Sequence, residues 1–377
     1  MRGVRSAPAQ FLASFLVPLA VVIFMGAGDS SSVSWTVQTS GLDTNLRGVS
    51  AARLHAPESV AVWASGSNGV ILRSVDRGKT WKQLHVAGGE TLDFRSIEAF
   101  DARTAYVMSS GEGELSRIYK TTDGGASWNL QYTDKRSAFF LDALACVSPK
   151  NCFALSDPVD GKFLLLATSD GEHWKELPRD NMPAAMPNEG AFAASGTVLL
   201  VRGADVYFAT GGPAARVFHS LDFGETWVAV ETPIAHGNAS SGIFSIAQMG
   251  NKIVAVGGDY KDPARSDGAG AYSLDNGKSW KLAAQQPGGY RSAVAWIDYG
   301  AVAAVGPNGE DVSEDAGVHW QHSDSLDLNA LVVAGYSDGW AVGPKGTVAR
   351  VVNSKHPIFE PDCLREPDGS AHLALGQ

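Results

Sequence analysis

A short motif that ends in tryptophan recurs along the chain and constrains its fold more than any other feature. The motif reads Ser/Thr-x-Asp-x-Gly-x-Ser/Thr-Trp, and its six copies occupy residues 74–81, 121–128, 168–174, 220–227, 273–280 and 313–320. The third copy is one residue short, and His173 and His319 replace Ser or Thr in two copies. Together with Trp35, the tryptophans that end these copies are spaced 40 to 53 residues apart. A near-constant period of this length indicates a repeat architecture.

Each period contains several short apolar runs bounded by Gly, Asp and Ser. One run from each period lies at residues 60–64, 105–108, 152–155, 206–209, 253–256, 301–305 and 339–342. Because these runs are rich in Val, Tyr, Phe and Trp, they are typical of β-strands, and no long apolar pattern of period 3.6 follows the N-terminal segment. Four short strands per period predict one blade of a β-propeller.

The two ends of the repeat array differ from its middle. Trp35 has no motif before it, and the last period, residues 328–353, has three runs but no motif after it. A strand around Trp35 could complete the last blade, which would leave no open sheet edge between the first and last blades. We therefore predict an all-β fold, a seven-bladed β-propeller over residues 33–354, closed by the N-terminal strand.

The motif itself resembles the Asp-box (BNR) motif of sialidase-like propellers. In such a turn the Asp carboxylate can accept backbone N–H bonds, and Gly supplies a positive φ. The Trp is large enough to pack between neighbouring sheets. The resemblance implies a structural role at the blade periphery for six aspartates, namely Asp76, Asp123, Asp170, Asp222, Asp275 and Asp315.

The N-terminus and the cysteines indicate an exported protein. Arg2 and Arg5 precede an apolar run at 11–24 and a small-residue stretch at 26–28, a pattern that predicts a signal peptide over residues 1–28, with a retained N-terminal anchor as the alternative. We expect a periplasmic or secreted protein with an irregular C-terminal tail at 355–377. Cys146 and Cys152 flank a predicted hairpin loop and predict a disulfide, with two free thiols as the alternative. Cys363 has no assigned role.

Charge and motif content exclude several functional classes. The net charge is −10 and no basic run occurs, so the electrostatic signature of a nucleic-acid-binding protein is missing. The His residues are scattered, and no dinucleotide or hydrolase motif stands in its required strand–turn–helix context. We therefore predict no metal, no cofactor and no catalytic residues, and we expect a monomer.

A binding site is expected where the first strand of each blade reaches the central channel. One position in each of these strands would point to the channel mouth, and around the ring these positions carry Arg47, Arg95, Asp142, Glu189, Gly242, Arg291 and Asn329. Converging charges in a concave mouth predict a binding site. The alternative is a polar lining of mutually paired residues that only keeps the channel wet.

Several phrases of the chain resemble exported bacterial propellers similar to photosystem II stability/assembly factors. These phrases lie at residues 156–161, 190–196, 215–220 and 257–260. The resemblance implies a non-enzymatic assembly factor that binds a membrane-protein subunit, partly through arginines.

Two other functional classes stay open. A sialidase-like glycoside hydrolase would use Arg47, Arg95 and Arg291 for a substrate carboxylate, with Glu189 and a nucleophile at Tyr260 or Tyr290. The family's Arg-Ile-Pro-like sequence is absent around Arg47. The other class is a structural surface protein.

Overall fold

The computed structural model describes residues 33–53, 60–334 and 338–353. The predicted signal peptide (1–28), the predicted tail (355–377) and Cys363 lie outside these residues. Within the described ranges, no helix has both the length and the apolar character needed to cross a membrane.

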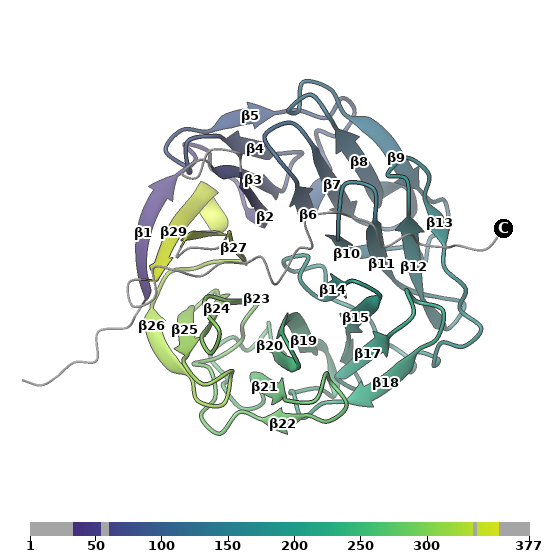
Figure 1. Cartoon of the computed structure of the whole chain (residues 1–377), viewed down its shortest axis with the longest axis vertical. Helices are drawn as coiled ribbons and strands as arrows, with labels where there is room; N and C mark the ends of the chain where they lie inside the picture. Colours follow the sequence, from purple (N-terminus) through teal and green to yellow (C-terminus); the bar gives the residue numbers. More distant parts are fainter. Residues whose placement is uncertain (1–32, 54–59, 335–337, 354–377) are drawn as a thin grey trace, which may run out of the picture. The chain divides into compact units, whose positions relative to one another are not determined.

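Seven antiparallel sheets lie around a common centre and confirm the predicted seven-bladed propeller (Figure 1). Blade 1 contains β2 (Leu46–Arg53), β3 (Val60–Gly66), β4 (Ile71–Ser74) and β5 (Lys82–Leu84). Blade 2 contains β6 (Asp93–Ala99), β7 (Ala105–Ser110), β8 (Arg117–Thr121) and β9 (Asn129–Thr133). Blade 3 contains β10 (Leu141–Cys146), β11 (Cys152–Val159), β12 (Lys162–Thr168) and β13 (Lys175–Glu176). Blade 4 contains β14 (Leu199–Arg202), β15 (Asp205–Ala209), β17 (Arg216–Ser220) and β18 (Val228–Glu231).

Blade 5 has a fifth strand, and blade 7 takes one strand from the other end of the chain. Blade 5 contains β16 (Gly211–Gly212), β19 (Asn238–Met249), β20 (Lys252–Asp259), β21 (Gly270–Ser273) and β22 (Lys281–Leu282). Blade 6 contains β23 (Ala293–Trp296), β24 (Val302–Gly306), β25 (Gly309–Ser313) and β26 (Gln321–Asp324). Blade 7 contains β27 (Ala330–Val333), β28 (Asp338–Val342), β29 (Thr347–Asn353) and β1 (Val33–Thr39). Two 3-10 turns, η1 (Gly113–Leu115) and η2 (Pro344–Gly346), lie in connecting loops.

The N-terminal strand closes the ring. β1 pairs with β29 in antiparallel register, with Trp35 opposite Val351, and the other edge of β29 pairs with β28. β1 is therefore the outermost strand of blade 7, as predicted, and β29 is not left with an open edge that could pair with another chain.

The repeated motif forms the turn between the third and fourth strands of blades 1 to 6. In the first copy, Asp76 Oδ1 accepts hydrogen bonds from the Thr80 amide at 2.9 Å and from Ser74 Oγ at 2.7 Å. Asp76 Oδ2 accepts a bond from Thr80 Oγ1 at 2.6 Å. Gly78 has a φ of 79°, a region that favours glycine. The Thr80 hydroxyl bond is the largest of the hydrogen bonds that lower the pKa of Asp76 to about 2.

The third copy closes the same turn with one residue fewer. Asp170 Oδ1 accepts the amides of Glu172 and His173, each at 2.8 Å, and its Oδ2 lies 2.7 Å from Nδ1 of His173. The histidine therefore takes the place of the Ser or Thr hydroxyl found in other copies. All of these bonds are local to the turn.

Two of the motif tryptophans pack edge to face against an aromatic residue of the preceding blade. Trp128 of blade 2 contacts Trp63 of blade 1 edge to face, with ring centroids 6.3 Å apart. Trp174 of blade 3 contacts Tyr106 of blade 2 in the same way at 6.0 Å. Trp63 lies on β3 and Tyr106 on β7, the second strands of blades 1 and 2, and both side chains are fully buried. These ring contacts therefore join successive sheets.

A disulfide links Cys146 to Cys152 across the hairpin between β10 and β11. The two cysteines are directly opposite in the strand register. The predicted disulfide is therefore confirmed in preference to two free thiols.

Candidate functional site at the channel mouth

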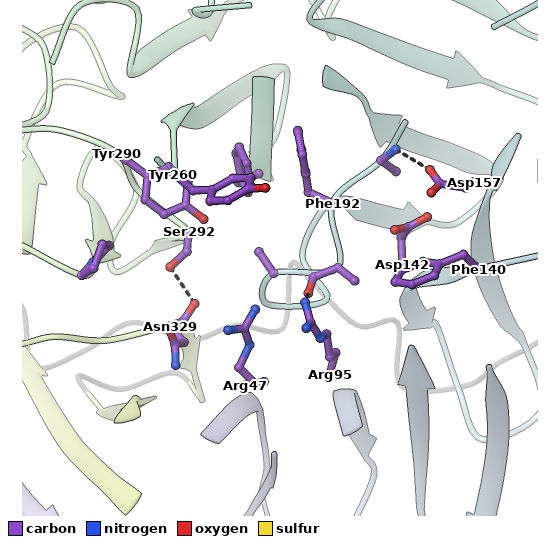
Figure 2. Close-up of a pocket in the computed structure, with 15 residues that line it drawn as sticks. Arg47, Arg95, Phe140, Asp142, Asp157, Phe192, Tyr260, Tyr290, Ser292 and Asn329 are labelled. Atoms are coloured by element: carbon purple, nitrogen blue, oxygen red, sulfur yellow. Dashed lines mark hydrogen bonds between the residues drawn. The ribbon is translucent and has the colours of Figure 1, made fainter. Parts of the chain in front are cut away.

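A cavity of about 550 Å³ lies where the inner strands of several blades begin, and we call it the mouth pocket (Figure 2). Its lining comprises Arg47, Arg95, Phe140, Asp142, Asp157, residues 191–194, Phe244, Tyr260, Tyr290, Ser292, Pro307 and Asn329. Four of the residues expected at the mouth are therefore brought together in one pocket, namely Arg47, Arg95, Asp142 and Asn329.

β-Bulges direct the side chains of three neighbouring inner strands into this pocket. In β2 the pairing shifts between Leu46 and Gly48, so that Arg47 is the extra residue. The same shift singles out Arg95 in β6 and Asp142 in β10. A bulge breaks the strict alternation of side chains and re-aims one of them, often next to a functional site. The recurrence in blades 1 to 3 explains how three charged residues line one cavity.

Arg95 is fixed by partners within the protein. Its Nε donates to Asp93 Oδ2 at 2.7 Å, and Nη1 donates to the carbonyl oxygen of Ala193 at 2.8 Å. Asp93 compensates the charge of this guanidinium, and the Ala193 bond fixes the loop at 191–194 over the pocket.

Arg47 is not compensated in this way. Its Nε is buried and has no hydrogen-bond partner among the described residues. Burial, and then the positive charge of Arg95, lower the pKa of the Arg47 guanidinium. An arginine nevertheless stays protonated in proteins. Figure 2 shows Arg47 and Arg95 next to one another with their guanidinium groups directed toward the middle of the pocket. This side of the mouth pocket can bind an anionic group.

Asp142 and Asp157 form a second charged element of the pocket. Asp142 is 1% exposed, and neither of its carboxylate oxygens has a hydrogen-bond partner in the described ranges. Burial, and then the negative charge of Asp157, raise the pKa of Asp142 well above its usual value. Asp157 Oδ1 accepts the Ala191 amide at 2.9 Å, and burial raises the pKa of Asp157 to about 6.

Aromatic side chains form the remaining wall. Phe192 stacks on Phe244 with centroids 3.9 Å apart, and Tyr290 meets Phe244 edge to face at 4.7 Å. Tyr260 stands at the rim with 45% of its surface exposed. Burial raises the pKa of Tyr290 above its usual value, so its hydroxyl stays neutral. The wall can take an apolar or aromatic group of a ligand.

Glu189 and Arg291, which were also expected at the channel mouth, are not among the residues that line the mouth pocket. Glu189 is 4% exposed; its Oε1 accepts bonds from Arg216 Nε at 2.8 Å and Thr210 Oγ1 at 2.7 Å. Arg291 is 0% exposed and its Nε donates to Asp311 Oδ2 at 2.7 Å. Both residues precede the first strand of their blade, since β14 begins at Leu199 and β23 at Ala293. Loop residues do not share the bulge register of blades 1 to 3.

Gly242, the expected mouth position of blade 5, packs against Gly211 instead. A Cβ atom at Gly242 would lie 2.3 Å from the Cα of Gly211, so this position permits close contact of two backbones. The bulge residue of β19 is Phe244, two positions later. The alignment of first strands does not find Phe244, because the bulge of β19 lies two positions after Gly242, and it does not find Phe140, Asp157 and Phe192, because they lie outside the first strands.

The residues of the hydrolase alternative are likewise separated. Arg47, Arg95, Tyr260 and Tyr290 line the pocket, but Arg291 is not among its lining residues. Across the described ranges, no group of three or more His, Cys, Asp or Glu side chains could hold a metal ion.

A family model described as "DUF6242 beta propeller domain" matches residues 29–301. The solved structure "YCF48 bound to D1 peptide" has a TM-score of 0.56 at 16% identity, and the match covers 84% of this chain and 94% of that chain. "YCF48 from Cyanidioschyzon merolae" has a TM-score of 0.59 at 16% identity, and covers 87% and 99%. The predicted resemblance to assembly-factor-like propellers is therefore confirmed as a resemblance of fold.

A curated relative covers far less of the chain. Vacuolar protein sorting/targeting protein 10 of Mycosarcoma maydis is 29% identical over 82 residues, which is 20% of this chain. The chain spans 5% of that relative's length, so the match adds no information on the activity of the whole protein.

Proposed function

The chain belongs to the DUF6242 β-propeller domain family, and from this premise we propose that it is a non-enzymatic, protein-binding scaffold whose mouth pocket binds a peptide segment of a partner. The observation that carries the proposal is Arg47, whose buried Nε has no partner among the described residues although it lines the cavity. A carboxylate of a partner could pair with the part of the Arg47 guanidinium that lines the cavity and would balance its charge.

The shape of the site favours a chain segment over a compact metabolite. A second cavity of about 610 Å³ is lined by Asp157, Pro158, Gly161 and residues 185–190. Asp157 belongs to both cavities, so they adjoin along one wall. An extended peptide rises about 3.3 Å per residue. A short segment could therefore start at Arg47 and leave over Asp157.

The fold likeness supports the same class of ligand. One of the similar structures is titled as YCF48 bound to a D1 peptide. A propeller of this architecture therefore has room for a peptide, and we extend that property to this chain as part of the proposal. We further propose that the partner is a membrane-protein subunit and that the propeller binds it as a monomer.

We also propose that the protein is exported. The signal-peptide pattern at residues 1–28 supports this location. The Cys146–Cys152 disulfide supports it as well, because such bonds persist mainly in oxidising compartments. Fusion of residues 1–40 to a reporter enzyme that is active only outside the cytoplasm tests this part. An inactive fusion would contradict export.

The binding function is tested by selection from a displayed library of random linear peptides. We expect the wild-type protein to enrich peptides that carry an acidic group. Arg47→Gln should weaken the binding of a selected peptide about 10- to 100-fold, because a hydrogen bond to a charged group contributes about 1.5–3 kcal/mol. Arg103→Gln is the matched control, since Arg103 is exposed in the turn at the opposite end of β6. Equal affinity of the wild type and Arg47→Gln would contradict the proposal.

A further inference from the structure

The acidic side of the mouth pocket is not explained by the binding of an anion. Asp142 and Asp157 line the same cavity as Arg47, yet neither forms an ion pair with a described residue. Asp142 is almost completely buried with both oxygens unpartnered. A buried polar group without a partner is costly, and a native structure that retains one calls for an explanation.

The nearest cation is already committed. Arg95 lies close enough to oppose the rise in the pKa of Asp142, but its guanidinium is paired with Asp93 and bonded to the Ala193 carbonyl. Arg47 comes from blade 1 and Asp142 from blade 3, with Arg95 of blade 2 between them. The pocket therefore holds Arg47, whose Nε has no hydrogen-bond partner, and, on the other side of Arg95, two aspartates without an ion-pair partner among the described residues.

The arrangement of the groups defines how a ligand would lie. In Figure 2, Asp142 and Asp157 stand on one side of the pocket, Tyr260 and Tyr290 on the other, and Arg47 and Arg95 between them. Asp157 also lines the second cavity, where its carboxylate can meet a chain that passes from one cavity to the other. Its Oδ1 is already bonded to the Ala191 amide, which fixes the orientation of the carboxylate.

Resting on the proposed peptide-binding function, we propose that Asp142 and Asp157 form a subsite for the ammonium or guanidinium group of a Lys or Arg side chain in the bound segment. The segment would place this basic residue within a few positions of the acidic group held by Arg47. The two subsites together select a segment with charges of both signs in a defined order, and they discriminate against segments that are only acidic.

The same displayed library tests the subsite with isosteric variants. We expect the wild type to enrich peptides in which a Lys or Arg lies at a constant spacing from an acidic residue. Asp157→Asn and Asp142→Asn should reduce the enrichment of the basic residue at least tenfold and leave the acidic preference in place. Arg47→Gln should reduce the enrichment of the acidic residue and leave the basic preference in place. Glu225→Gln, an exposed carboxylate in the outer turn of blade 4, is the matched control.

The possible results distinguish failure of the basic subsite from failure of peptide binding itself. Selected peptides that are acidic but show no basic preference would overturn the subsite and leave peptide binding intact. A basic preference that persists in both aspartate variants, with thermal melting showing that they are folded, would also overturn it. If the wild type enriches no peptide at all, the peptide-binding function fails and the subsite fails with it.

Discussion

Glu310 offers a quantitative test of the electrostatics of this propeller. It lies on β25, is 0% exposed, and neither carboxylate oxygen has a hydrogen-bond partner in the described part of the chain. Burial, and then the negative charge of Asp324, raise its pKa from 4.5 to about 8. Since the folded state holds this proton more tightly than the unfolded state, folding stability should fall as pH rises from 4.5 toward 8.

The size of the effect follows from the same pKa change. A rise from 4.5 to about 8 corresponds to at most about 5 kcal/mol across the whole window, at about 1.36 kcal/mol for each pH unit. We reduce this to about 2–3 kcal/mol because the effective dielectric response of a protein around a buried charge is larger than that of a dry interior. Glu310→Gln keeps the shape but does not titrate, so its unfolding free energy should lack this part of the pH dependence.

Urea unfolding at pH 5 and pH 8 measures the effect. The free-energy loss between the two pH values should be about 2–3 kcal/mol smaller in Glu310→Gln than in the wild type. The unpaired amide of the variant costs the same at both pH values and cancels in this comparison. Glu225→Gln controls for the loss of one surface charge. Parallel pH curves for the wild type and Glu310→Gln would show that burial does not raise the pKa of Glu310 in the folded protein.

Three further predictions concern the turns and the pocket. Asp123→Ala should lower the melting temperature, because it removes the bonds from the Ser127 amide and hydroxyl, while peptide affinity stays unchanged; an unaltered thermal melt would contradict this. The affinity for a peptide with a basic residue, measured calorimetrically, should rise from pH 5 to pH 7 as Asp157, with a pKa of about 6, ionises opposite Asp142 and Arg95. Asp157→Asn should flatten that profile, and a fall in wild-type affinity would mean that a protonated carboxyl donates to the ligand. A fluorogenic sialoside should not be hydrolysed, and turnover that disappears in Arg47→Gln would favour the hydrolase.

The fold could be predicted from the sequence because its determinants are local and repeated. Each motif closes its own turn with hydrogen bonds such as those of Asp76 to Thr80 and Ser74, so one copy reports one blade boundary. The closure by β1 was predictable because Trp35 has no motif before it and the last period lacks a fourth strand. These features depend little on the rest of the chain.

The site was predictable mainly where the inner strands keep a common register. Arg47, Arg95 and Asp142 occupy equivalent bulges, so aligning the runs of blades 1 to 3 found all three. Glu189 and Arg291 occupy similar places in the sequence but fold back in loops, where Arg216 and Asp311 neutralise them. Such partners lie 27 and 20 residues away, and no local pattern specifies that pairing.

The aromatic wall shows the same limit. The stacking of Phe192 on Phe244 joins a loop before blade 4 to a bulge of blade 5. Neither residue differs in sequence from an ordinary core phenylalanine. Only the folded propeller brings these two phenylalanines into one pocket with Arg47 and Arg95.

The most direct test of the account is a crystal structure of the propeller with a peptide selected from the library. We expect the peptide to occupy the mouth pocket, with its acidic group at hydrogen-bond distance from the Arg47 guanidinium and its basic side chain against Asp157. Density for the peptide along the outer strands, with the mouth pocket holding water alone, would contradict it.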